Sequence, residues 1–203
     1  MSGRPRVVLA TRNRRKLDEL RRILEPEAPG LEVLGLADVV AYDEPAETEP
    51  TFVGNVLLKA RAAACATGLP ALADDSGLCV DALNGMPGVL SARWAGPGRD
   101  DDANNALLLA QVADVPDERR GAEFRCAVAL AGSGGADVAE VGVVRGRLLR
   151  TPRGAGGFGY DPLFVADGQE VSNAELPPAA KDLISHRGRA LRAIVPALLG
   201  ALT

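Results

Sequence analysis

The chain has 203 residues, of which 47% are hydrophobic and 25% are charged. This composition excludes fibrous and disordered proteins, and the length suits one domain or one compact domain with two lobes. Lysine and arginine total 23 against 27 for aspartate and glutamate. The resulting net charge of −4 argues against a general nucleic-acid binder and leaves a small anionic ligand open.

No apolar stretch approaches the about 20 residues that cross a bilayer, and the first residues lack the pattern of a signal peptide. We therefore expect a cytoplasmic protein with no membrane partner. The three cysteines, Cys65, Cys79 and Cys126, lie far apart among small apolar neighbours. This placement predicts buried, reduced thiols rather than disulfides or a zinc site.

Strands and helices are predicted to alternate along the chain, from the spacing of apolar residues and the position of glycine and proline. In the first half, the predicted elements are strands over 6–10, 31–36 and 71–73, helices over 14–24 and 56–67, and an acidic, proline-rich surface loop over 43–50. In the second half, they are a strand over 79–83, a turn over 84–88, a helix over 102–115, strands over 124–131 and 138–144, and a final helix from Ser185 that Pro196 should kink or interrupt.

The two later strands are expected to form an antiparallel hairpin through the turn Gly132-Ser133-Gly134-Gly135. Alternating helices and strands with one hairpin predict an α/β or mixed α+β fold.

Residues 11–16 join the first predicted strand to the first predicted helix. Thr11 offers a hydroxyl, Asn13 a carboxamide and Lys16 a positive charge, and the free N–H groups at a helix start favour phosphate. The segment therefore predicts an anion site. The alternative is a capped helix with a solvated basic face.

Asp74 and Asp75 are adjacent carboxylates at the end of a predicted strand, directly before Ser76. Two acids this close stay ionised when a cation or hydrogen-bond donors compensate them, and such oxygen ligands suit Mg²⁺. The alternative is a solvated turn. The three aspartates at 100–102 directly precede a predicted helix, where acids most simply interact with the helix dipole.

A glycine-dense segment over 154–159 contains Phe158 and is followed by Tyr160 and Asp161. Glycine lets the backbone approach a ligand closely, and an aromatic ring offers a stacking surface, so the segment predicts a site for a planar base. The alternative is a glycine-rich turn with an aromatic residue in the core.

The single histidine, His186, stands between Ser185 and Arg187, a few residues after Lys181. Imidazole and guanidinium donors side by side suit a base with a keto group over one with an amino group. The alternative is a structural histidine next to a serine that caps the last helix.

Six segments follow one another in a set order along nearly the whole chain. They read Thr11-x-Asn13-x-x-Lys16, Thr51-Phe52-x-x-Asn55-x-x-x-Lys59-Ala60, Ala73-Asp74-Asp75-Ser76-Gly77-Leu78, Pro87-Gly88-x-x-Ser91-Ala92-Arg93, Gly156-Gly157-Phe158-Gly159-Tyr160-Asp161-Pro162 and Ser185-His186-Arg187. In order and spacing they closely resemble the inosine/xanthosine triphosphate pyrophosphatase family. Six segments in register are far more specific than any one of them.

The resemblance implies an enzyme that hydrolyses ITP, dITP and XTP to the monophosphate and pyrophosphate, and so cleanses the nucleotide pool, with Mg²⁺ as its cofactor. It also implies a single pyrophosphatase domain over residues 1–203 and a homodimer. The implied fold is two-lobed, with a long central mixed sheet and a nucleotide cleft between the lobes.

Matching positions carry the family's residue roles onto this chain. Asp75 would be the catalytic base and, with Asp74, would form the metal site. The implied triphosphate ligands are Thr11, Asn13, Lys16, Lys59 and Lys181. At the base, Phe158 would stack while Asp161, His186 and Arg187 read its edge, and Ser76, Gly159 and Tyr160 complete the substrate-binding set.

One position departs from the family pattern, because Gly54 stands where the family has an acid that helps to bind the metal. We therefore expect weaker Mg²⁺ binding, with Glu47 or Glu49 of the preceding loop as substitutes. Two other functions stay open: a nucleotide sensor on the same scaffold with impaired catalysis, and a pyrophosphatase for modified pyrimidine nucleotides.

Overall fold

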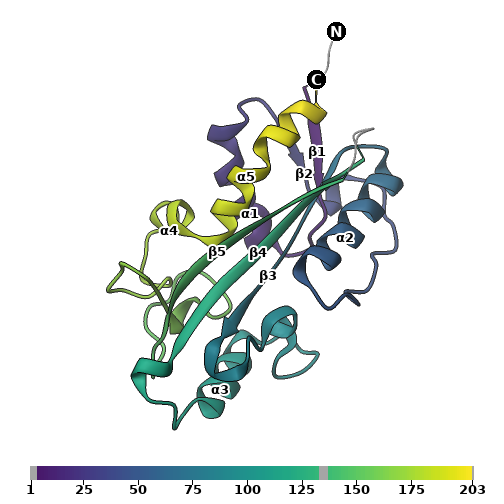
Figure 1. Cartoon of the computed structure of the whole chain (residues 1–203). Helices are drawn as coiled ribbons and strands as arrows, with labels where there is room; N and C mark the ends of the chain where they lie inside the picture. The colour runs from purple at the N-terminus through teal and green to yellow at the C-terminus, as the bar shows by residue number, and fades with distance from the viewer. Residues whose placement is uncertain (1–3, 133–136, 203) are drawn as a thin grey trace. The chain divides into compact units, whose positions relative to one another are not determined.

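The computed structural model describes residues 4–132 and 137–202, and its helices and strands alternate along the chain (Figure 1). The strands are β1 (Arg6–Leu9), β2 (Glu32–Leu34), β3 (Ala71–Val80), β4 (Gly121–Ala131), β5 (Val138–Leu148) and β6 (Phe164–Ala166). The α-helices are α1 (Arg14–Glu27), α2 (Phe52–Thr67), α3 (Asp101–Gln111), α4 (Pro178–Ile184) and α5 (His186–Ala201). Within these residues, no helix combines the length and apolar character needed to cross a membrane.

The strands form one six-stranded mixed sheet in the order β2-β1-β3-β4-β5-β6. β1 pairs in parallel with both β2 and β3, whereas β5 and β6 are antiparallel. The predicted α/β class with mixed strands is therefore confirmed. β4 and β5 are neighbours, as the predicted hairpin requires, and of its turn only Gly132 lies among the described residues.

The chain divides into two compact units, which are described separately below. Unit 1 comprises Met1–Asp75, Cys126–Gly142 and Arg187–Thr203, and unit 2 comprises Ser76–Arg125 and Val143–His186.

The core of unit 1 covers both faces of the sheet. Alternate residues of a strand point to opposite faces, so Val7 and Leu9 pack with α1 and α5, while Val8 packs with α2. α2 presents small residues such as Ala60 and Ala63 to this second face. Small side chains let a helix lie close to the sheet, which agrees with the low aromatic content of 3%.

The core of unit 2 gathers the larger side chains. Phe124 of β4 meets Phe164 of β6 edge to face, with ring centroids 4.8 Å apart. Leu108 of α3 and Tyr160 belong to the same buried cluster, so α3 is fixed to the sheet beside the glycine-dense segment.

Local signals explain where several helices begin and end. Asn13 caps α1 by accepting from the Lys16 N–H, and Thr51 caps α2 by accepting from the Gly54 N–H at 3.0 Å. α2 ends at Gly68, which adopts the left-handed conformation at φ 67°. This end of α2 is the one predicted from the sequence.

Several predicted boundaries were wrong. β3 runs without a break from Ala71 to Val80, so the separate strand predicted over 79–83 is instead the end of β3 followed by a short turn of 3-10 helix. α5 continues through Pro196 to Ala201. Among the cysteines, Cys126 is buried as predicted, whereas Cys65 is exposed and Cys79 is half-buried.

Candidate active site

The residues of unit 1 that were predicted to bind phosphate begin where β1 leads into α1. Thr11 Oγ1 accepts from the Asn13 N–H at 3.2 Å, and Asn13 Oδ1 accepts from the Lys16 N–H at 3.2 Å. The first turn of α1 is thereby fixed, with its remaining N–H groups directed out of the helix start. β1 ends opposite Leu72 of β3, so the carboxylates that follow on β3 lie just beyond the end of β1.

Asp74 of β3 is buried, with 1% of its surface exposed. Its Oδ2 atom lies 2.9 Å from Nζ of Lys16 and 3.3 Å from Nε of Arg187. Lys59 donates to the backbone oxygen of Asp74 at 2.7 Å. Burial on its own would raise the pKa of Asp74, but the positive charges of these three side chains outweigh burial and lower the pKa well below its usual range.

The second carboxylate oxygen of Asp74 differs from the first. Oδ1 is buried and has no hydrogen-bond donor among the residues that the structure describes. A buried carboxylate oxygen without a donor is costly, since it has lost water without replacement. A cation is a chemically suitable partner for this atom.

Asp75 follows directly and behaves in the opposite way. It is 7% exposed, and Asn55 of α2 donates from Nδ2 to its Oδ2 at 3.1 Å. Burial raises the pKa of Asp75, and the nearby Lys59 and Lys16 charges only partly oppose that rise. Two adjacent carboxyl groups with pKa values shifted apart are suited to different roles.

Arg187 has contacts that differ from the predicted ones. Its guanidinium forms ion pairs with Glu19 of α1 and with Asp74, and only 1% of the residue is exposed. Through these contacts Arg187 neutralises two buried carboxylates, and its role at the edge of a base stays a prediction. Glu19 lies outside every motif, and its only sequence signal is an acid beside the apolar stripe of α1.

The acidic loop before α2 contacts this cluster. Glu47 pairs with Lys59 at 2.9 Å, and the backbone N–H of Glu49 donates to Asn55 Oδ1 at 3.0 Å. A Cβ atom on Gly54 would lie 2.6 Å from Cβ of Glu49 and 2.8 Å from its Cγ. Glu49 thus occupies the space beside Gly54, and Glu47 reaches Lys59, so the loop supplies acids where α2 has none in its first turn.

The glycine-dense segment of unit 2 is built around Asp161. Its Oδ2 accepts from the Phe158 N–H at 2.9 Å and from Lys181 Nζ at 2.7 Å, and its Oδ1 accepts from Asn173 at 3.2 Å. A Cβ atom on Gly157 would lie 2.2 Å from Asp161 Oδ2, which explains why glycine is needed there. With both oxygens engaged, Asp161 holds the loop together, and its contact with a base edge stays a prediction.

Unit 2 also contains Lys181, which was predicted at the triphosphate, and Tyr160 and His186 of the predicted substrate-binding set. Lys181 Nζ lies 5.0 Å from the centre of the Phe158 ring, and Tyr160 donates from its hydroxyl to the Ser91 carbonyl at 2.9 Å. The His186 ring is stacked on Phe124, with centroids 4.7 Å apart and an interplanar angle of 9°. Tyr160 and His186 are both buried.

The structure therefore groups the predicted residues into two sets. Unit 1 holds Thr11, Asn13, Lys16, Lys59, Asp74, Asp75 and Arg187, and unit 2 holds Phe158, Gly159, Tyr160, Asp161, Lys181 and His186. Ser76 is the first residue of unit 2 on β3 and is half-buried.

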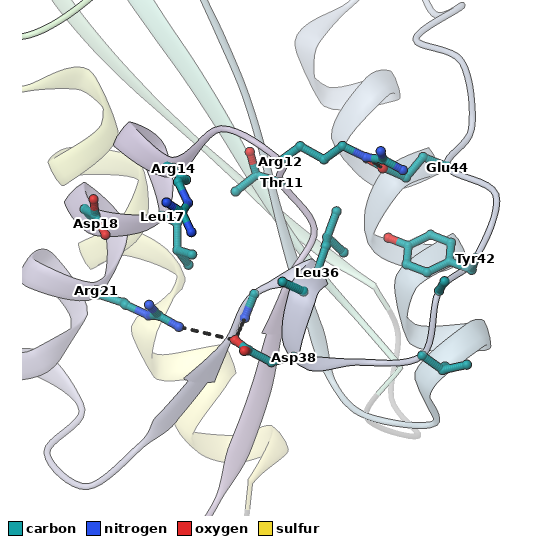
Figure 2. A pocket seen from close by; sticks show the side chains of 14 residues that line it. Thr11, Arg12, Arg14, Leu17, Asp18, Arg21, Leu36, Asp38, Tyr42 and Glu44 are labelled. Atoms are coloured by element: carbon teal, nitrogen blue, oxygen red, sulfur yellow. Dashed lines mark hydrogen bonds and ion pairs between the residues drawn. The ribbon is translucent and has the colours of Figure 1, made fainter.

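A cavity of about 640 Å³ lies in unit 1 beside the start of α1 and was not predicted from the sequence. Thr11 belongs to its lining, together with residues of α1 and of the segment 35–44. Figure 2 shows Arg12 extended to Glu44 and Arg21 directed at Asp38, 3.6 Å away. These ion pairs balance the charge of the cavity, which adjoins the predicted phosphate segment through Thr11.

Comparison with known proteins identifies the fold and then the family. The chain matches the solved structure of the Ham1 protein of Staphylococcus aureus with a TM-score of 0.85 and 35% identity, over 96% of this chain and 98% of that one. It matches a nucleoside-triphosphatase / dITP/XTP pyrophosphatase of Mycobacterium abscessus with a TM-score of 0.76 and 53% identity, over 94% and 99%. The fold is therefore that of the mixed α/β Ham1 proteins.

The sequence agrees with this fold. The Ham1 family profile matches residues 7–197. A dITP/XTP pyrophosphatase of Nocardia farcinica is 62% identical over 194 residues, which are 95% of this chain and 94% of the relative. The chain belongs to the Ham1 family.

Proposed function

We propose that this protein is a dITP/XTP pyrophosphatase, which hydrolyses noncanonical purine nucleoside triphosphates, ITP included, to the monophosphate and pyrophosphate. Family membership and the relatives' activity support this hydrolase function. The single structural observation that carries it is the Asp74–Asp75 pair, in which one buried carboxyl is held ionised by cations and the next has a raised pKa. Such an enzyme removes deaminated purine nucleotides from the nucleotide pool.

The proposed substrate uses both sets of residues. The triphosphate would meet Thr11, Asn13 and the lysines of unit 1, and the base would stack on Phe158 of unit 2. We also propose that the chain is a single pyrophosphatase domain over residues 1–203, a proposal supported by the family match over residues 7–197.

Asp75 is the proposed general base. The oxygen atom of a water molecule attacks phosphorus at the linkage between the α- and β-phosphates. The bond between this phosphorus and the bridging oxygen breaks, pyrophosphate leaves, and Asp75 takes the proton of the water. Its raised pKa brings its basicity closer to that useful near neutral pH. Asn55 orients the carboxylate through its 3.1 Å hydrogen bond, and Lys16 and Lys59 supply positive charge for the phosphates.

Mg²⁺ is the proposed cofactor. Asp74 and Asp75 would hold it, and the buried Asp74 Oδ1 without a donor among the described residues supports a cation there. Within the same residues no three His, Cys, Asp or Glu side chains gather to hold a metal, but Mg²⁺ in such enzymes needs only one or two carboxylates besides phosphates and water. When bound, the ion neutralises charge on the phosphate oxygens.

Discrimination against adenine follows from the group at C6 of the base. A deaminated purine carries a carbonyl oxygen there, which accepts hydrogen bonds, whereas adenine carries an amino group. A site built to donate would leave its donors unmatched with adenine, at a cost of about 1–3 kcal/mol for each buried donor. His186 is the candidate donor of unit 2, where its ring is stacked on Phe124. The predicted cytoplasmic location and homodimer also remain proposals, and sedimentation of the purified protein tests the latter.

The experiment that tests the function measures pyrophosphate release from dITP, XTP and ITP against dATP and dGTP, with and without Mg²⁺. We expect turnover of the deaminated purines and its loss without the metal. Tight binding of dITP without turnover would favour the nucleotide sensor instead, and preferential turnover of modified pyrimidine nucleotides would favour the third function.

A further inference from the structure

Both backbone groups of Gly159 are held by side chains of α3. The Gly159 N–H donates to Oδ2 of Asp101 at 2.9 Å, and its carbonyl accepts from Nδ2 of Asn105 at 3.0 Å. Asp101 and Asn105 are four residues apart on the helix, so their side chains project from the same face. α3 therefore holds the glycine-dense segment at Gly159, the residue that follows Phe158.

This part of α3 is firmly anchored. Asn105 is 6% exposed and Leu108 is fully buried. The neighbouring Asn104 accepts from the Ala95 N–H at 2.7 Å and donates to the Ala92 carbonyl at 3.3 Å. The helix is thus tied to the preceding loop as well as to the core, and it offers Gly159 a rigid support.

The contacts around Phe158 fix its backbone on both sides. The peptide group before its Cα is held because the Phe158 N–H donates to Asp161 at 2.9 Å. The peptide group after its Cα is held because the Gly159 N–H donates to Asp101. With both peptide planes fixed, the φ and ψ angles of Phe158 are fixed, and so is the direction of its Cα–Cβ bond, which limits the rotamers open to the ring.

Gly159 itself has φ at +61°, a left-handed conformation that favours glycine. Its N–H and carbonyl are both engaged with α3, so we assign it a conformational role in the loop rather than a direct contact with the base. The orientation of the Phe158 ring then depends on two carboxylates, one from the loop itself and one from α3.

We propose that Asp101 and Asn105 are positioning residues that set the orientation of the Phe158 ring and through it the affinity for the base. The inference rests on the proposed function, in which Phe158 stacks on the purine. The sequence predicts interaction with the helix dipole as the simplest role of the aspartates at 100–102. Asp100 does cap α3 by accepting from the Ala103 N–H at 3.0 Å, whereas Asp101 also holds the loop.

The kinetic test replaces Asp101 with alanine. Loss of one charged hydrogen bond that orients the ring is expected to raise KM for dITP about tenfold, with kcat changed by less than about twofold because the phosphate-side residues are untouched. Asp101→Asn keeps an acceptor and should recover most of the affinity. Asp102→Ala is the matched control, since it removes the same charge from the same turn at an exposed position.

An equal rise in KM for Asp102→Ala would overturn the proposal, because charge at the helix start would then explain the effect. So would a fall in kcat at unchanged KM for Asp101→Ala.

A second measurement does not depend on activity. Amide hydrogen exchange should become about tenfold faster in the segment 154–163 of Asp101→Ala and of Asn105→Ala, while α2 exchanges as in the wild type. Unchanged exchange in that segment would overturn the proposal that Asp101 and Asn105 hold it in place. If the wild type failed to hydrolyse dITP, the proposed function would be wrong, whereas this exchange result would still show whether Asp101 and Asn105 hold the segment.

Discussion

Asp74 and Asp75 are consecutive residues of β3, both buried, and burial and charge shift their carboxyl pKa values in opposite directions. Asp74 forms ion pairs with Lys16 and Arg187, whereas Asp75 accepts a hydrogen bond from the neutral amide of Asn55. The difference follows from their direct partners, because Asp74 contacts side chains of α1 and α5, whereas Asp75 contacts Asn55 of α2. Two consecutive residues of β3 thus supply an acid that stays ionised and, next to it, a candidate base.

Replacing Asp75 with asparagine is expected to lower kcat by about 10²–10⁴-fold, the usual contribution of a general base. The same change should raise the melting temperature at neutral pH. The folded pKa of Asp75 is raised above its unfolded value, so its ionised form destabilises the native state above that pKa. Thermal unfolding and steady-state kinetics check both effects, and a less stable Asp75→Asn protein would contradict the assignment of the pKa shift.

The pH dependence of activity follows from the same shift. A general base acts in its ionised form, so kcat/KM should fall as the pH drops through the raised pKa of Asp75. The acid limb of the profile should therefore lie above the pKa of an ordinary aspartate, which is about 3.9. A profile that stays flat down to that value would exclude Asp75 as the titrating base.

The Glu19–Arg187 ion pair is expected to be important for stability although Glu19 belongs to no recognised motif. Removing one partner of a buried pair leaves the other charge uncompensated and typically costs about 3–5 kcal/mol. We expect Glu19→Gln to lower the free energy of unfolding by about that amount in a denaturant titration. Asp18→Asn is the control, since Asp18 is the exposed neighbour on the same helix, and an equal effect of the two variants would contradict the account.

The effects of substitutions at Gly54 and Glu49 on the free energy of unfolding are expected to be coupled. Gly54→Glu on its own should destabilise the protein by about 1–3 kcal/mol, the usual cost of overpacking, because a Cβ atom there would lie 2.6 Å from that of Glu49. The double variant Gly54→Glu/Glu49→Gly should recover most of this loss and retain an acid beside the site. A double-mutant cycle on unfolding free energy measures the coupling, and simple additivity would show that the two residues do not compete for space.

The double variant also addresses the expected weakness of Mg²⁺ binding. If Glu47 and Glu49 already supply the missing acid from the loop, moving it to residue 54 should leave the Mg²⁺ dependence of activity within about threefold of the wild type. A large gain in Mg²⁺ affinity would instead show that the loop does not compensate for Gly54.

Much of the fold and many of the candidate site residues could be predicted from the sequence because the sequence signals for them are local. The cap at Asn13, the end of α2 at Gly68 and the dense glycines before Phe158 each depend on near neighbours in the chain. β3 was broken in two by prediction because its acids look like a turn, and only their compensation by Lys16, Arg187 and Asn55 lets them lie inside a strand.

The remaining features depend on partners that are distant in sequence. No local pattern pairs Glu19 with Arg187 or Asp101 with Gly159, since the two members of each pair lie on different elements. Arg187 shows the consequence, because its position beside His186 suggested a shared role at the base. The turn of the chain into α5 instead brings its guanidinium to Asp74 and Glu19.

The most direct test of the account is phosphorus NMR of dITP and dATP, each incubated with the wild-type protein and Mg²⁺ and, in parallel, with Asp75→Asn. We predict that the wild type converts dITP to the monophosphate and pyrophosphate, leaves dATP largely intact, and loses this conversion on substitution of Asp75. Release of inorganic phosphate with a nucleoside diphosphate, or undiminished conversion by Asp75→Asn, would contradict it.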